Sequence, residues 1–373
     1  RTINNSAGIG DVLEILGLIY NEQSSFDSSE YYFKEAIKGY SSLATGQKSK
    51  EEKSILHKLS KCYYNIATLY FNRGKYDLAL EYSFKSKNIE ERFQTANGAA
   101  IALKQISCCY QLIGKYAQAV DCALQALRIF EKNNDFKMVS SSYNDIGSFY
   151  TEQKDYSRAL DCFFKALEIN IENKSEETSP DIYTNIGSAL LNSGKSEESL
   201  KYYMKALDLY NRQRNDRGIS TVYSNLAYAF KNLNRYSESI EYNIKAVDLM
   251  KKIGFKMGYT YTYCNISELY NLTGNYGKSI EYGEEALRLS KEAKILYIEE
   301  QANLTLSVAY QKLQKPERAL DYFKKYSFLK DSLLNIEKQK QITEMQVRYE
   351  TETLEKQKQI AEQESELLKA KAS

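Results

Sequence analysis

An internal repeat with a period of 40 residues constrains this chain more than any other feature. A short motif recurs along the sequence, in which an aliphatic residue is followed at once by a small residue and, four positions on, by an aromatic or large apolar residue. The aliphatic residue, called the anchor below, falls at Leu16, Ile66, Ile106, Ile146, Ile186, Leu226, Ile266 and Leu306. From Ile66 onward every interval is 40 residues, which indicates a tandem array of one structural unit.

The pattern within each unit predicts two antiparallel helices. Residues at offsets −3, 0, +1 and +4 from the anchor share one helical face, so Tyr143, Ile146, Gly147 and Tyr150 should form one buried stripe. Offset +8 is a turn position, where a glycine such as Gly74 can adopt the left-handed conformation that ends a helix. Small residues at offsets +13 and +20 then let the second helix approach the first closely. Such a pair cannot bury its apolar face alone and must stack on its neighbours.

The first interval departs from the period. Leu16 and Ile66 are 50 residues apart, and the polar stretch over residues 41–53 contains the excess. We expect an enlarged loop there.

The repeated pattern, seen in YNDIGSFYTEQKDYSRALDCFFKALEI at residues 143–169, resembles the tetratricopeptide repeat (TPR). The resemblance covers about residues 11–330 and implies an all-α fold, a right-handed α-solenoid of about eight 40-residue helix pairs. The usual repeat has about 34 residues. Longer units like these are also found in kinesin light chains and bacterial peptide-receptor TPR proteins. We therefore expect one superhelical array over residues 1–330.

The composition changes after residue 330. Residues 331–373 contain no Gly or Pro and mix acidic with basic residues, which predicts a long C-terminal connector helix, capped by Asp331 or Ser332. Its apolar positions fit a heptad seam only loosely. A parallel coiled coil in a homodimer, a single solvated helix and a helix packed on the last repeat are all compatible with this pattern.

Binding residues are expected on the first helices. The residues immediately before the last seven anchors should line the concave groove of the superhelix; they are Asn65, Gln105, Asp145, Asn185, Asn225, Asn265 and Thr305. The resemblance to peptide-binding TPR proteins implies that the asparagines among them hydrogen-bond the backbone of a bound peptide. Further groove neighbours are expected at Asn192, Asn232, Tyr228, Lys231 and Asn271. The alternative is that the amides join neighbouring helices.

Other classes of function find little support in the sequence. The formal net charge of +2 gives no general attraction to nucleic acid, and the 33 tyrosines fit core packing better than a base-stacking platform. Six cysteines without a CxxC pair and the single histidine, His57, do not suggest a metal site. No phosphate-binding loop or nucleophile motif is present, so we expect neither catalysis nor a cofactor.

The order of the parts suggests a sensor. A repeat array ending in the run Lys330-Asp331-Ser332-Leu333, followed by Glu337-Lys338 and by Glu344-Met345-Gln346-Val347-Arg348-Tyr349-Glu350-Thr351-Glu352, resembles the TPR sensor proteins of Bacteroidetes. There a helical connector leads to a membrane span and a histidine kinase or DNA-binding output domain. The resemblance implies the periplasmic, peptide- or protein-binding region of a two-component sensor histidine kinase, attached to a membrane only through segments outside this chain. An intracellular adaptor and a cytoplasmic peptide receptor that sequesters a regulator are the alternatives.

Overall fold

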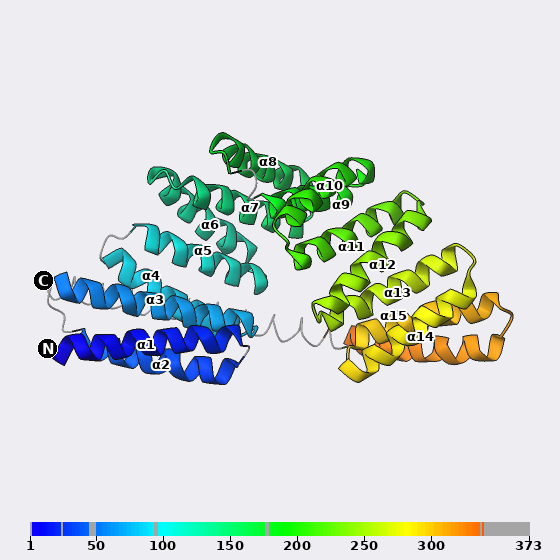
Figure 1. The fold of residues 1–373 in the computed structure, drawn as a ribbon, viewed down its shortest axis with the longest axis horizontal. Coiled ribbons are helices and arrows are strands. Elements are labelled where there is room, and N and C mark those ends of the chain that lie inside the picture. Colours follow the sequence, from blue (N-terminus) through cyan, green and yellow to red (C-terminus); the bar gives the residue numbers. More distant parts are fainter. Residues whose placement is uncertain are drawn as a thin grey trace, which may run out of the picture. The chain divides into compact units, whose positions relative to one another are not determined.

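The computed structural model describes residues 2–23, 25–44, 50–92, 96–175, 179–335 and 338. All regular secondary structure in these ranges is helical (Figure 1). The helices are α1 Thr2–Glu22, α2 Phe26–Leu43, α3 Lys50–Asn72, α4 Tyr76–Arg92, α5 Ala96–Leu112, α6 Tyr116–Lys132, α7 Phe136–Glu152, α8 Tyr156–Glu172, α9 Pro180–Asn192, α10 Ser196–Arg212, α11 Asp216–Asn232, α12 Tyr236–Lys252, α13 Lys256–Leu272, α14 Tyr276–Ala293 and α15 Leu296–Lys312. A further helix covers residues 316–335.

The helices form antiparallel pairs within two compact units. Unit 1 spans Arg1–Gln213 and holds the pairs α1/α2 to α9/α10. Unit 2 spans Arg214–Ser373 and holds α11/α12, α13/α14 and the pair of α15 with the helix over residues 316–335. Odd-numbered helices, called first helices below, carry the anchors. The predicted all-α array of two-helix units is confirmed.

Seven of the eight anchors lie in the core, as the repeat requires, while Leu16 of α1 is half-buried. Ile66, Ile106 and Ile186 are fully buried, and Ile146 and Gly147 are buried too. Tyr143 and Tyr150 of the predicted stripe are only half-buried. The Tyr143 hydroxyl donates a hydrogen bond to Glu131 at 3.3 Å.

One turn geometry ends the first helices. Gly74 has φ +70°, and Lys75 N–H donates to the Tyr70 carbonyl at 2.9 Å while Gly74 N–H donates to that of Phe71 at 3.0 Å. These two bonds define a Schellman motif. Lys154 at φ +60° occupies the equivalent position and shows that the hydrogen bonds, not glycine alone, impose the conformation.

Within each pair, the side chain at offset +1 on the first helix packs against the side chain at offset +17 on the second helix. The sizes of these two side chains are matched, and this relation is called the size-matching rule below. Where the first helix has glycine, an aromatic ring of the second helix fills the space; the pairs are Gly17 with Phe33, Gly147 with Phe163 and Gly187 with Tyr203. Where the first helix has Ala or Ser, its partner is smaller, as in Ser107 with Ala123. The last pair breaks the rule with Ser307 and Phe323, and Phe323 is exposed.

Two expectations about segment ends are wrong. Helix α2 continues to Leu43 and α3 begins at Lys50, so most of the predicted loop over residues 41–53 is helical and residues 45–49 lie outside the described part. Glu51 and Glu52 in the first turn of α3 complement the helix dipole there. The helix over residues 316–335 also runs through Asp331 and Ser332, and the Ser332 hydroxyl donates to the Phe328 carbonyl at 2.8 Å, so neither residue caps a new helix.

The predicted connector and its coiled coil lie almost wholly outside the described residues, which include only 331–335 and 338 of that segment. The boundary between an array over residues 1–330 and a connector over 331–373 stays a prediction.

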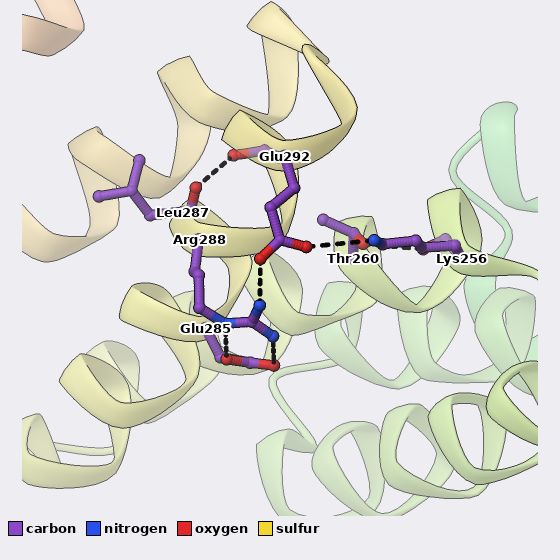
Figure 2. A network of polar contacts seen from close by, with 7 residues as sticks. Lys256, Thr260, Glu285, Leu287, Arg288 and Glu292 are labelled. Carbon is purple, nitrogen blue, oxygen red and sulfur yellow. Dashed lines mark hydrogen bonds and ion pairs between the residues drawn. The ribbon is translucent and has the colours of Figure 1, made fainter.

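An exposed ion-pair network joins the beginning of α13 to the end of α14 (Figure 2). Glu292 accepts from Lys256 at 3.2 Å and also pairs with Arg288, whose guanidinium forks onto Glu285 at 2.6 and 2.9 Å. The hydrogen bond from Lys256 lowers the pKa of Glu292. Exposed pairs of this kind stabilise a fold only weakly, so the network orients side chains more than it holds the repeat together.

Candidate functional site

First helices contact one another directly through polar side chains at offsets −2, −1, +2 and +5 from the anchor, on a surface called the first-helix face below. Asn65 of α3 donates to Glu14 of α1 at 3.0 Å, and Asn271 of α13 donates to the Thr305 carbonyl of α15 at 2.9 Å. Both bonds bypass the second helix that lies between these helices in the sequence. The predicted residues before the anchors all lie on this face, which we describe separately for each unit.

In unit 1 the first-helix face is a chain of mutually satisfied polar groups. Gln105 donates to Thr68 at 2.7 Å and accepts from Ser83 at 2.9 Å, so its amide joins three helices. Asn185 donates to Asn144 of α7 at 2.9 Å. Amides used in this way hold neighbouring helices together, which is the structural alternative considered for this position.

A lysine–aspartate pair continues this chain between α5 and α7. Lys104 Nζ lies 3.1 Å from Asp145 Oδ2 and also contacts the Ser141 hydroxyl. Burial raises the pKa of Asp145, and the nearby Lys104 ammonium opposes that rise. Burial also raises the pKa of the Cys108 thiol to about 12, so this thiol is not an activated nucleophile.

In unit 2, within the described chain, the asparagines at offset −1 make no such contact with a neighbouring first helix. Asn225 of α11 and Asn265 of α13 are half-buried, and neither side-chain amide has a hydrogen-bond partner among the described residues. Lys231 pairs with Glu268 of α13 at 2.6 Å. The Asn271 amide nitrogen is used between α13 and α15, while its oxygen is buried without a partner in the described structure. Two adjacent helices therefore each present one free amide.

Three exposed tyrosines accompany these free amides on unit 2. Tyr228 of α11, Tyr261 of α13 and Tyr297 of α15 lie at offsets +2, −5 and −9, which point in nearly the same direction around a helix. The ring centroids of Tyr261 and Tyr297 are 6.4 Å apart. Burial raises the pKa of Tyr261, and Tyr228 and Tyr297 are among the groups that act on it. The face therefore combines apolar rings with free amides.

Sequence reasoning identified only one of these tyrosines. Tyr261 and Tyr297 occupy different offsets from Tyr228 and so escape a search for repeated positions. Converting each offset into an angle around its helix would have grouped all three. By contrast, the tyrosines at offset +16, such as Tyr242 and Tyr282, pack against framework rings whose centroids are 5.4–5.8 Å away, in stacked or tilted geometry.

The remaining predicted groove residues are distributed unevenly. Asn192 and Asn232 are exposed at the last positions of α9 and α11. Asn65 and Asn185 are bonded to neighbouring first helices, and Lys231 and Asn271 also have partners. Ligand contact by any of the nine residues stays a prediction. Asn225, Asn265 and Tyr228 alone combine a place near the middle of a first helix with unused polar groups.

Other kinds of site would need a disulfide, a cluster of metal ligands or a membrane-spanning helix. All six cysteines lie in described residues and are free thiols. Across the described chain, no His, Cys, Asp and Glu side chains gather as a metal site would require. Among the described helices, none is both long enough and apolar enough to cross a bilayer.

Comparison with protein families gives one match. The profile described as "Tetratricopeptide repeat" matches residues 59–132, 138–212, 178–252 and 218–292, which together make up more than half of the chain. A comparison with curated proteins gives no match.

Several solved structures share the fold at low sequence identity. A signal transduction ATPase with numerous domains from Pyrococcus horikoshii, which has a tetratricopeptide repeat sensor, is 18% identical with a TM-score of 0.64; the alignment covers 76% of this chain and 45% of that one. Aspartyl phosphate phosphatase F from Bacillus subtilis is 15% identical with a TM-score of 0.58, over 87% of this chain and 94% of that one. A Rap protein complexed with Competence and Sporulation Factor is 16% identical with a TM-score of 0.53, over 90% and 99%.

Proposed function

This chain belongs to the tetratricopeptide repeat family, whose arrays are protein-binding scaffolds, and we propose that it binds an extended peptide segment on the first-helix face of unit 2. The observation that carries the proposal is the pair of free amides at Asn225 and Asn265 on adjacent first helices. The Rap structure, which has the same fold, is a complex with Competence and Sporulation Factor and so supports binding by arrays of this kind.

The chemistry of an amide suits a peptide backbone. A side-chain amide both donates and accepts, so it can pair with one backbone N–H and C=O of an extended chain without reading its side chains. Each such bond contributes about 0.5–1.5 kcal/mol net. In unit 1 the Asn185 amide already contacts Asn144, and a ligand would have to displace that contact first. Unit 2 therefore offers the stronger contact at the same offset.

The tyrosines supply an apolar contact surface, which the amides do not offer. Tyr228, Tyr261 and Tyr297 present exposed rings that can pack against apolar or proline side chains of the ligand. Lys231 and Glu268 are paired across the face and leave it without a strong excess of either charge. We expect a ligand that is neutral overall and rich in apolar side chains.

A peptide array of 12-residue sequences, probed with the purified chain, tests the proposal. For the best binder, the double variant Asn225→Ala with Asn265→Ala should lower affinity about 5- to 150-fold, since it removes two amide pairings. Its melting temperature should stay the same, because neither amide bonds to the described protein. Asn185→Ala is the matched control: it should change affinity little. Equal losses in both variants, or no loss in either, would contradict the assignment to unit 2.

We further propose that the chain is the periplasmic ligand-binding region of a sensor histidine kinase, with residues 331–373 relaying binding toward the output domain and joining two copies. The order of parts supports this proposal, since a repeat array precedes a charged segment without Gly or Pro. Reading the complete gene tests it: an apolar span and a kinase domain after this region are expected. A reading frame that ends at Ser373 would favour the adaptor or cytoplasmic receptor instead.

A further inference from the structure

The outward surface of α1 is an apolar stripe without a described partner. Ile9, Val12, Ile15 and Ile19 follow one another at helical spacing and are 56%, 57%, 55% and 42% exposed. No charged residue belongs to the stripe. Asp11 and Glu14 are ion-paired with lysines of α3 at 2.7 and 3.2 Å, and Glu22 lies three residues beyond Ile19. A repeat face that meets water is normally polar.

The stripe matches the stacking surface of the other first helices in unit 1. Val12 lies at offset −4, where Cys62, Ala102, Ser142 and Ile182 are at most 5% exposed. Ile19 lies at offset +3, where Leu69, Cys109, Phe149 and Ala189 are at most 2% exposed. The same positions that are sealed in later pairs are therefore open on α1.

Helix α2 shows what covers such a surface. Its Ala36 and Tyr40 pack in one cluster with Leu59 and Cys62 of α3. Its Phe33 packs in a second cluster with Leu69 of α3, and Ile37 borders both clusters. The four residues of α2 follow the spacing i, i+3, i+4 and i+7, with a small residue second. One amphipathic helix is thus enough to seal one stacking surface.

We infer that the α1 stripe binds an amphipathic α-helix of a partner polypeptide, in the way that α3 binds α2. The partner helix carries large apolar residues at i, i+4 and i+7 and a small residue at i+3. This inference concerns a surface other than the one used in the proposed function. It continues an interface already present in the fold, and recognition of a helix by i, i+3, i+4 and i+7 anchors is a general mode of peptide binding.

A second copy of this chain fits the stripe poorly. Its α2 is already committed, with Phe33, Ala36 and Tyr40 fully buried. Its helix over residues 316–335 has Phe323, Tyr326, Ser327 and Lys330 at the four equivalent positions. A tyrosine replaces the small residue there and a lysine replaces the last apolar one, so that helix lacks the complementary surface.

A labelled peptide copying residues 26–43 tests the inference. Positions 31 and 35, which face away from the four packing residues, carry a hydrocarbon cross-link, because free peptides of this length are poorly helical. The whole chain should bind this probe saturably, and Val12→Glu with Ile19→Glu should weaken binding by at least about tenfold, since both side chains would otherwise be buried. The melting temperature should be unchanged. Met204→Glu, at a residue 48% exposed on α10, is the matched control and should bind normally.

Four results would overturn the inference. The probe could fail to bind, or it could bind equally well to the Val12→Glu and Ile19→Glu variant, which would mean that it exchanges with α2 on α3. Sedimentation could also show that the wild-type chain forms dimers which the same variant dissociates. A probe with Phe33→Ser and Ile37→Ser should not bind at all, and binding by it would equally contradict a site for an amphipathic helix.

Discussion

Gly147→Ala should destabilise the protein only while Phe163 is present. A Cβ atom at Gly147 would lie 2.5 Å from Cε1 and 2.7 Å from Cδ1 of Phe163, and that ring is 1% exposed, so it has no free space to enter. Overpacking of this kind costs about 1–3 kcal/mol, while the higher helix propensity of alanine returns about 1 kcal/mol. The net loss should be up to about 2 kcal/mol.

The second half of the test removes the ring. Phe163→Ala alone should cost about 3–5 kcal/mol, because it leaves a cavity between α7 and α8. In that background Gly147→Ala should stabilise the protein by about 1 kcal/mol, since only the helix propensity remains. The pair Ser107 and Ala123 shows that the fold accepts two small residues here. The coupling between the two sites should therefore be about 1–3 kcal/mol.

Urea unfolding followed by circular dichroism measures the four proteins of this cycle. Gly39→Ala on α2 is the matched control, because a Cβ there meets no atom within 4 Å, and it should be neutral or stabilising. An identical effect of Gly147→Ala in both backgrounds would refute the size-matching rule, as would a stabilising effect beside the intact Phe163.

Two further predictions concern a turn and an ion pair. Lys154→Gly should raise the free energy of unfolding, measured by urea unfolding, by about 0.5–1 kcal/mol, because Lys154 holds φ +60°, a conformation that glycine adopts without strain. A loss of stability would mean that contacts of the lysine side chain outweigh the backbone strain. Burial alone would raise the pKa of the Asp11 carboxyl group. Hydrogen bonds from Lys58 and Tyr40 outweigh that effect and lower the pKa below 3.8. Its contribution is therefore present above pH 3.8 and is lost as the pH falls through the lowered pKa, so Asp11→Asn should destabilise at pH 5–8 and the difference should shrink in acid; a constant difference in melting temperature down to pH 2 would contradict this.

Much of the fold could be predicted because each unit repeats the same apolar, small and turn residues at fixed offsets from its anchor. The anchor spacing predicts the pairing of helices, and Gly74 marks a left-handed turn that the structure confirms. Lys154 and Gln314 stand at the same offset and adopt the same conformation although neither is glycine, since the hydrogen bonds of the turn impose it. The continuous helix through Asp331 was missed for the opposite reason: a residue type that favours the N-cap starts no new helix where no turn precedes it.

The candidate site was harder to predict because it depends on neighbours in other units. Asn185 and Asn225 occupy the same offset, yet Asn185 meets Asn144, 41 residues earlier, and Asn225 meets no described partner. A pattern read within one unit contains no information about that neighbour. The difference between a structural amide and a free one arises only when successive first helices are placed side by side.

The uniform length of the helices limits how this gene can change. Helices α4 to α8 and α10 to α13 all span 17 residues, and each first helix meets the next at fixed offsets. One inserted codon within a helix turns every later side chain by about 100° and separates partners along the rest of that helix. Gain or loss of 40 codons at once leaves all contacts of the same kind in place. Related genes should therefore differ in length by whole units.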